Sequence, residues 1–177
     1  DVLLRRGAGH VVAVDVGYGQ IAWRLREDPR VTVLERTNVR TLDPAAVAPA
    51  PGLVVGDLSF ISLTLVIPSL VRAAAAEADF LLLVKPQFEV GRERLGAGGV
   101  VRDTRLHAET VMAVSACARS HGLDVLAAIA SPLPGPAGNV EYFLHMRAGS
   151  GQEPDGGLES AVRSAIATGP AGKEARK

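Results

Sequence analysis

Short apolar runs rich in β-branched residues alternate along the chain with longer mixed segments. Each run has the length of a β-strand, and several are apolar throughout, as in strands that are covered on both faces. The six predicted strands are His10–Val14, Val31–Glu35, Leu53–Asp57, Phe80–Lys85, Leu123–Ile129 and Val140–Met146. This alternation is typical of a doubly wound α/β fold.

Helical spacing of apolar residues is found in three of the mixed segments. The predicted helices are Gln20–Arg26, Leu63–Ala76 and Thr104–His121, and Gly122 supplies a C-terminal stop for the last of them. Pro68 lies inside the second helix. A proline there predicts either a kink or the start of the regular part of the helix.

The last two strands are joined without a helix. The connection is the proline-rich and glycine-rich segment 131–139. Parallel neighbours need a long crossover, so these two strands are expected to form an antiparallel pair at one side of a mostly parallel sheet.

The composition changes after Arg147 to glycine, serine, proline and charged residues. Only Leu158–Ala167 could form a short helix there. The sequence therefore predicts a folded domain over residues 1–147 and a weakly ordered C-terminal tail over 148–177.

Composition limits the function classes. The 177 residues are 47% hydrophobic, which is enough for one domain with a sizeable core. No stretch reaches the roughly 18 apolar residues of a membrane span, so no stable membrane association is expected. A lone Cys117 and no signal peptide favour a reducing cytoplasm. The 19 basic residues balance the 19 acidic ones, so charge alone does not indicate a nucleic-acid partner.

Candidate cofactor contacts follow the first predicted strand. Asp15 ends this strand, where a carboxylate in doubly wound folds commonly accepts hydrogen bonds from a ribose diol. The glycines of the next segment, 16–20, permit a tight turn beside a ligand, and Tyr18 could cover a base, so Val16 and Tyr18 are further candidates. The alternatives are that Asp15 merely caps a turn and that the glycines serve the turn alone.

Asn38 follows the second predicted strand, at the same rim of the sheet as Asp15. Its amide has both a donor and an acceptor, which suits adenine recognition. The alternative is that Asn38 forms an Asx turn before Asp43-Pro44.

Charged residues lie at the ends of three further strands. Asp57 ends the third and Lys85 ends the fourth, while Glu141 begins the last. Since the last strand is expected to be antiparallel, its start lies at the rim where the parallel strands end. A lysine buried beside a carboxylate could share its proton and act on a weakly acidic hydroxyl. The alternative, and the default if Lys85 stood without the two carboxylates, is a strand-end lysine whose ammonium group reaches out to water. The three residues are candidate catalytic groups, and no metal site is expected.

These segments resemble the TlyA (haemolysin A-like) family of the FtsJ-type ribose methyltransferases, from Asp1 to about Arg147. The motifs that carry the resemblance are Val16-Gly-Tyr-Gly-Gln20 with Trp23-Arg-Leu-Arg26, Gly56-Asp-Leu-Ser-Phe-Ile-Ser-Leu63, Val84-Lys-Pro-Gln-Phe-Glu89, Gly98-Gly-Val-Val-Arg-Asp103, and Ser131-Pro132 to Gly138-Asn-Val-Glu141.

The resemblance implies a Rossmann-like class I methyltransferase sheet, S-adenosylmethionine as methyl donor and a ribosomal RNA cytidine as substrate. It also implies a Lys-Asp-Lys-Glu tetrad that activates the ribose 2'-hydroxyl, of which Asp57, Lys85 and Glu141 match the last three members. Asp57 would in addition contact the cofactor. The first lysine, the glycine-rich cofactor loop and an S4-like RNA-binding domain are expected upstream of Asp1.

The family's strand order, 3-2-1-4-5-7-6, implies that the six predicted strands are the second to the seventh. The central first strand is then expected upstream as well, because Asp1–Arg6 reads as the end of the helix that follows it. Without that strand, two strand edges would be unpaired inside the core, and a fragment starting at Asp1 is expected to be unstable.

Three other functions stay open. Asp15 would also suit a nicotinamide dehydrogenase, although the strand-ending Lys85 and the final hairpin favour a methyltransferase. The haemolysin name suggests membrane lysis, but the sequence has neither a span nor a basic amphipathic helix. The neutral charge argues against an inactive RNA-binding module. Arginines in the segment Gln87–Arg105 could touch phosphates, and a plain solvated loop is an equal alternative.

Overall fold

The computed structural model describes residues 1–135, 137–150 and 157–170. Its α-helices are α1 (Val2–Arg5), α2 (Trp23–Arg26), α3 (Ile67–Ala73), α4 (Pro86–Glu89), α5 (Thr104–Ser120) and α6 (Leu158–Thr168). Its strands are β1 (Val11–Val14), β2 (Val31–Leu34), β3 (Leu53–Gly56), β4 (Asp79–Val84), β5 (Leu123–Ala130) and β6 (Tyr142–Ala148). Short 3-10 helices are η1 (Val39–Thr41), η2 (Pro44–Val47), η3 (Leu63–Leu65), η4 (Arg92–Arg94) and η5 (Ala97–Gly99). The predicted α/β fold is confirmed.

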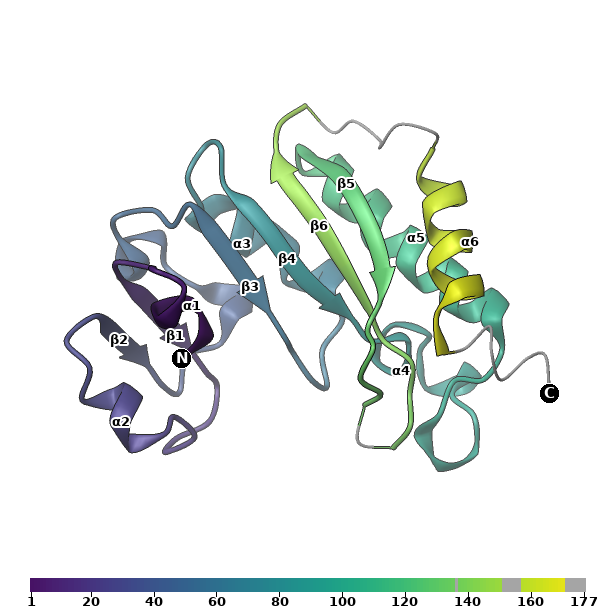
Figure 1. Ribbon diagram of the computed structural model, residues 1–177, viewed down its shortest axis with the longest axis horizontal. Helices are drawn as coiled ribbons and strands as arrows, with labels where there is room; N and C mark the ends of the chain where they lie inside the picture. Colours follow the sequence, from purple (N-terminus) through teal and green to yellow (C-terminus); the bar gives the residue numbers. More distant parts are fainter. Residues whose placement is uncertain (136, 151–156, 171–177) are drawn as a thin grey trace.

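The strands form two sheets (Figure 1). One is the parallel pair β1–β2, and the other has the order β3-β4-β6-β5. β3 and β4 are parallel, whereas β6 is antiparallel to both β4 and β5. The antiparallel hairpin predicted from the helix-free 131–139 connection is therefore confirmed.

An apolar groove of about 390 Å³ separates β1 from β3, and both strands line it. Val11 N of β1 donates to Arg30 O beside β2, and Asp79 N of β4 donates to Gly52 O beside β3. Backbone hydrogen bonds alternate between the two sides of a strand. The peptide groups of Val12 in β1 and of Leu53 in β3 therefore face the groove. In the described residues β1 and β3 are not paired with each other. That an upstream strand fills the groove between them stays a prediction.

Two of the predicted helices are shorter than expected. Pro68 lies in the first turn of α3, where its missing N–H costs nothing, and a 3-10 turn precedes it. The proline thus marks the start of the regular helix. The segment predicted as Gln20–Arg26 is helical only from Trp23, because the backbone of the preceding Ala22 is not helical, with φ −54° and ψ 136°.

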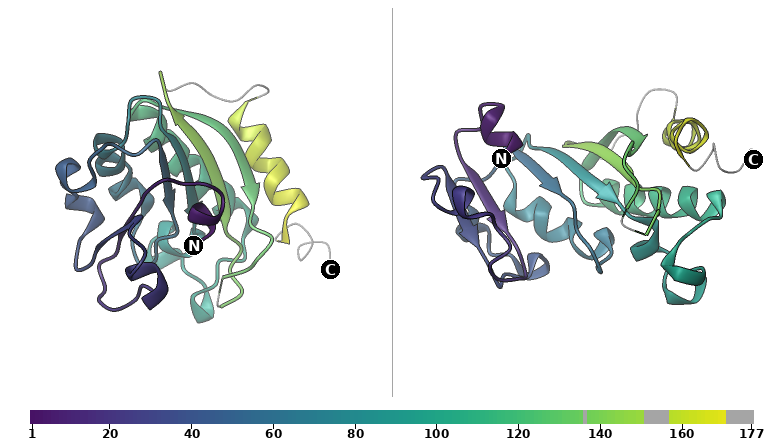
Figure 2. Two further views of the ribbon diagram at one scale, coloured as in Figure 1. Left: turned by 60° about the vertical axis from the view of Figure 1, so that its left-hand side comes forward. Right: turned by 60° about the horizontal axis from the view of Figure 1, so that its bottom comes forward.

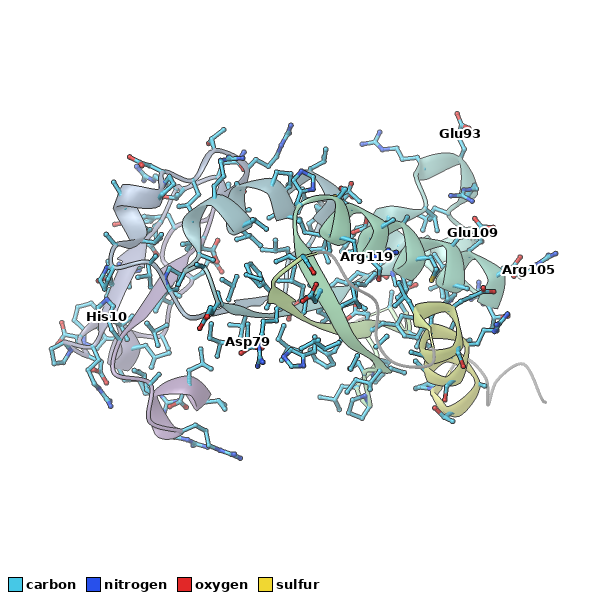
Figure 3. The ribbon with its side chains drawn as sticks, turned by 90° about the horizontal axis from the view of Figure 1, so that it is seen from above. His10, Asp79, Glu93, Arg105, Glu109 and Arg119 are labelled. Atoms are coloured by element: carbon cyan, nitrogen blue, oxygen red, sulfur yellow. The ribbon has the colours of Figure 1, made fainter. Side chains whose placement is uncertain are left out.

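The core lies on one face of the four-stranded sheet. Alternate residues of β4 and β6, such as Phe80, Leu82 and Leu144, are at most 1% exposed under α3 and α5. The opposite face carries Asp79, Leu81 and His145, and Figure 3 shows Asp79 on the side away from α5. There Asp79 accepts hydrogen bonds from His145 and Arg147, and the arginine holds the pKa of Asp79 below its usual value.

Helix α6 belongs to the core, which differs from the weakly ordered tail expected over 148–177. Leu158, Val162, Ala165 and Ile166 are buried, and the helix packs against β5 and α5 (Figure 2). Their spacing places them on one face of the helix. Packing of this face against the core stabilises the helix, although the composition of the segment is mostly polar. Residues 151–156 and 171–177 lie outside the described residues.

A buried histidine fixes the start of β6. His107 is 1% exposed, and its ring nitrogens lie 2.8 Å from Tyr142 Oη and from Val101 O. Burial lowers the pKa of His107, which favours the neutral ring. Because the carbonyl can only accept, Nε2 donates to Val101 O and Nδ1 accepts from the Tyr142 hydroxyl. The residue next to Tyr142 is Glu141, so this network holds the backbone beside a predicted site residue.

Candidate active site

The carboxyl ends of β3 and β4 bring Asp57 and Lys85 into contact. Both residues directly follow their strands, which pair in parallel through Gly56 and Leu82. Lys85 Nζ lies 2.6 Å from Asp57 Oδ1. The lysine is only 9% exposed, whereas the aspartate side chain is 72% exposed. The charge pair therefore lies at the surface of the protein with its cation enclosed and its anion open to a ligand.

A second oxygen also contacts the lysine. Lys85 Nζ donates to Ser59 Oγ over 3.2 Å, from the loop that follows Asp57. A lysine that snorkels would place its ammonium group in water, and the observed burial does not fit that alternative. Sequence reasoning missed Ser59, although it lies inside the quoted motif 56–63.

Glu141 lies at the same edge of the sheet but does not touch the lysine. It precedes β6, whose Tyr142 pairs with Val84 at the end of β4. Its side chain is enclosed, and Gln87 Nε2 donates to Glu141 Oε1 over 2.9 Å. In the part of the chain that the structure describes, no hydrogen bond or ion pair joins Glu141 to Lys85. The three predicted residues thus share one rim, and their catalytic roles stay predictions.

The candidate cofactor residues lie on the β1–β2 side. Asp15 Oδ1 accepts from Gly17 N over 2.7 Å, so its turn-capping role is real. A Cβ on Gly17 would come within 3.1 Å of that oxygen, which explains the glycine. Asp15 Oδ2 has no partner among the described residues and is available to a ligand. Val16 and Tyr18 are 74% and 67% exposed, and the Arg36 guanidinium lies 4.6 Å from the centre of the Tyr18 ring.

Asn38 follows β2 and begins the 3-10 helix η1. Its Oδ1 accepts from Arg40 N over 3.0 Å. This is the Asx turn given as the alternative, so the side-chain oxygen already has a donor. Adenine recognition by Asn38 stays a prediction that concerns its amide nitrogen.

Glu35 holds the 16–20 segment in place, a role that the sequence did not predict. Its carboxylate accepts from Gly19 N over 2.6 Å and from the Arg26 guanidinium. The hydrogen bond from Arg26 holds the pKa of Glu35 below its usual value. A charged Glu35 therefore fixes the backbone between the candidate cofactor residues and helix α2.

The sequence of residues 1–148 matches the model of the FtsJ-like methyltransferases. The chain belongs to this family. It is 57% identical over 171 residues to the 16S/23S rRNA (cytidine-2'-O)-methyltransferase TlyA of Mycobacterium tuberculosis, a match that covers 96% of this chain and 64% of the relative. It is 33% identical to "Hemolysin A" of Brachyspira hyodysenteriae, over 82% of this chain and 61% of that protein.

Solved structures give the same fold for this FtsJ-like methyltransferase. A putative hemolysin from Streptococcus thermophilus superposes with a TM-score of 0.91 at 36% identity, covering 99% of this chain and 62% of that one. A putative hemolysin from Lactococcus lactis has a TM-score of 0.86 at 37% identity, over 92% and 79%. The chain thus spans about 64% of the length of the curated TlyA relative.

In this FtsJ-like methyltransferase, Glu89 anchors the loop that carries Asp57 and Ser59. Ser62 Oγ donates to Glu89 Oε2 over 2.5 Å, and Leu63 N donates to Oε1 over 2.8 Å. Burial raises the pKa of Glu89. Because Glu89 lies on α4 directly after Lys85, it ties the Asp57 loop to the segment that carries Lys85.

Glu89 predicts a pH dependence of stability. Its raised pKa means that the folded protein favours the protonated form, so this contribution is full below the unfolded-state pKa and is lost as pH rises through the folded-state pKa. We expect Glu89→Gln to flatten the fall in the free energy of unfolding between acid and neutral pH. Urea unfolding at several pH values measures this, with the exposed Glu93→Gln as control. Equal pH slopes for both variants would contradict the assignment.

An exposed aromatic ring stands beside the lysine. Phe60 is 91% exposed and has a φ of 62°, which is rare for a bulky residue and costs of order 1–3 kcal/mol. Its ring centre lies 5.0 Å from that of Phe88 on α4. The Phe60 ring is not buried in the core, and its backbone conformation is unfavourable, so folding stability does not explain why an aromatic residue stands here. An exposed ring held in this way suits contact with a ligand. Sequence reasoning assigned no role to Phe60.

Proposed function

We propose that this FtsJ-like methyltransferase transfers a methyl group from S-adenosylmethionine to the ribose 2'-hydroxyl of a ribosomal RNA cytidine. The enclosed Lys85 in contact with the open Asp57 carries the proposal, because this pair can hold a hydroxyl at the ligand-binding rim of the sheet. The substrate class is that of the similar 16S/23S rRNA (cytidine-2'-O)-methyltransferase TlyA. The whole protein would act on ribosomal RNA or a ribosomal subunit in the cytoplasm.

The cofactor would be held by Asp15, Val16, Tyr18, Asn38 and Asp57. The unused oxygen of Asp15 supports this assignment, since a ribose diol needs an acceptor there. When bound, S-adenosylmethionine supplies a methyl group activated by its sulfonium charge.

The side chains at the β3–β4 rim would position the nucleophile. Lys85 Nζ would hold the ribose oxygen by donating to it, pass one of its protons to Asp57, which is open to water, and then take the hydroxyl proton on its freed lone pair as the oxygen attacks the methyl carbon. Ser59 fixes the direction of the lysine, and Glu141 supplies a second carboxylate nearby. Methyl transfer needs the attacking oxygen, the carbon and the sulfur nearly in line, so positioning supplies much of the catalysis.

Two arginines next to the site would contact RNA phosphates. Arg94 pairs with Glu109 and Arg105 pairs with Asp103, whereas Arg92 and Arg102 are exposed and have no ion pair among the described residues. Two arginines without an ion pair can neutralise only two phosphates, which gives modest affinity for RNA. An S4-like RNA-binding domain upstream, as the family resemblance implies, would supply the rest.

The direct test is methyl transfer by the complete protein. Ribosomal subunits incubated with labelled S-adenosylmethionine should gain 2'-O-methylcytidine, which nucleoside analysis separates from base methylation. Ribose methylation mapped on ribosomal RNA from cells with and without the gene identifies the nucleotide. Methylation of a base or of protein alone would overturn the proposal.

The alternatives make different predictions. A dehydrogenase would bind NAD tightly and not S-adenosylmethionine, which isothermal titration distinguishes. A lytic protein would make liposomes leak at low protein concentration, and the Lys85→Ala variant would do so as well. Over the described residues, none of the helices has both the length and the apolar character needed to cross a bilayer.

Phe60 is expected to stack on the target base. An aromatic face contributes about 1–3 kcal/mol per stacked base, so Phe60→Ala should lower kcat/KM for RNA roughly 5- to 150-fold. Phe60→Tyr keeps the ring and should retain most of the activity, and cofactor affinity should be unchanged in both variants. Steady-state methyl transfer and calorimetry measure these quantities. Equal activity of Phe60→Ala and Phe60→Tyr would remove the stacking role.

A further inference from the structure

A glutamine holds the Glu141 carboxylate. Gln87 lies on α4, two residues after Lys85, and its Nε2 donates to Glu141 Oε1 over 2.9 Å. Glu141 is 5% exposed, and this is the single hydrogen bond of its carboxylate within the described residues. One short helix therefore fixes both the lysine and, through an amide, the glutamate on the neighbouring strand.

Packing alone does not explain this glutamine. A carboxylate can only accept, so the amide nitrogen must face Glu141. The amide oxygen is then left buried, without a partner in the part of the chain that the structure describes. An unpaired buried acceptor costs about 1–3 kcal/mol, whereas an apolar side chain of the same length would cost nothing of the kind. The hydrogen bond to Glu141 thus comes with a loss of folding stability at the unpaired amide oxygen, which indicates that Gln87 has a role in the site.

Gly135 closes the other side of the carboxylate. A Cβ on Gly135 would lie 2.7 Å from Glu141 Oε1, closer than any side chain can approach. Gly135 N donates to Asn139 O over 2.8 Å, and the Asn139 side chain is in turn bonded to Gly99 O and Val101 N. Gly135 is therefore held where it is, and Glu141 Oε1 has no room to move towards it.

We propose that Gln87 is a positioning residue that holds the Glu141 carboxylate against Gly135, in the orientation needed for methyl transfer at Lys85. The inference rests on the proposed function. Gln87 acts through Glu141 and touches neither substrate nor cofactor. The sequence feature behind it is the Val84-Lys-Pro-Gln-Phe-Glu89 motif, in which the glutamine lies two residues after the lysine.

Gln87→Met removes the donor and keeps the length of the side chain. In the complete protein we expect kcat to fall about tenfold to a hundredfold, as for a misplaced catalytic group, with KM for RNA and for S-adenosylmethionine within about twofold. The thermal midpoint is expected to change little, because removal of the unpaired amide oxygen offsets the loss of the one hydrogen bond to the buried carboxylate. An unchanged kcat in the folded variant would overturn the proposal.

Gly135→Ala tests the same carboxylate from the opposite side. The new methyl group would displace the far end of the Glu141 side chain rather than backbone, so the fold should survive while kcat falls. Gly9→Ala is the matched control, since a Cβ there meets nothing within 4 Å. Equal kcat for the two alanine variants would contradict the proposal even if Gln87→Met did not fold.

Gln87→Glu separates positioning from packing through pH. Two carboxylates at this distance repel when both are ionised, whereas a shared proton at lower pH restores a donor towards Glu141. Activity relative to the unmodified protein should therefore rise as pH falls, and a constant ratio would overturn the proposal. Lys85→Ala in the same assay keeps the two claims distinct: if it stays active, the proposed function fails, and if only the Gln87 and Gly135 variants stay active, this inference fails alone.

Discussion

Lys85→Ala is expected to lower kcat for methyl transfer by at least about a hundredfold while leaving the affinity for S-adenosylmethionine nearly intact. The lysine contacts Asp57 and Ser59 at the rim, where it would hold the ribose oxygen, and it has no predicted contact with the cofactor. Single-turnover transfer of labelled methyl groups to ribosomal subunits measures the rate, and isothermal titration measures the affinity.

Ser59→Ala is the matched comparison for that variant. It removes one of the two oxygen partners of Lys85 but leaves the ion pair with Asp57, so the expected loss of kcat is smaller. Unchanged turnover of Lys85→Ala would exclude the lysine from the mechanism. A parallel loss of cofactor affinity would instead place Lys85 in the cofactor site.

Asp15→Ala is expected to weaken S-adenosylmethionine binding by roughly tenfold to a hundredfold. A hydrogen bond to a charged group contributes about 1.5–3 kcal/mol, and the free oxygen of Asp15 is the proposed acceptor for the ribose diol. Calorimetry on the complete protein gives the affinity directly.

Asp43→Ala is the control for the turn. Asp43 Oδ1 accepts from Ala45 N over 2.9 Å, two residues on, just as Asp15 Oδ1 accepts from Gly17 N. Both variants lose the same local hydrogen bond, but only Asp15 is a candidate ligand contact. If both variants bind the cofactor with the affinity of the unmodified protein, Asp15 is only a cap.

The strands were predictable because their signal is local. Runs such as Phe80–Lys85 are apolar and short, and each of the six predicted runs contains an observed strand or overlaps most of one. The long helix, predicted over Thr104–His121, was equally clear from its periodicity and the glycine after it. Helix α2 was overestimated because the backbone of Ala22 is not helical, with a ψ of 136°.

The residues that end the strands, and hence the shared rim of Asp57, Lys85 and Glu141, could be predicted from the amino-acid sequence. Chain order and strand direction suffice for that, since parallel strands end at the same edge. The contacts of each of these residues depend on how the chain folds in three dimensions. Lys85 contacts Asp57 whereas Glu141 contacts Gln87, the oxygen of Asn38 is used by a turn, and α6 completes the core under β5. These outcomes depend on side-chain distances between elements far apart in the chain, which no local pattern of apolar and polar residues encodes.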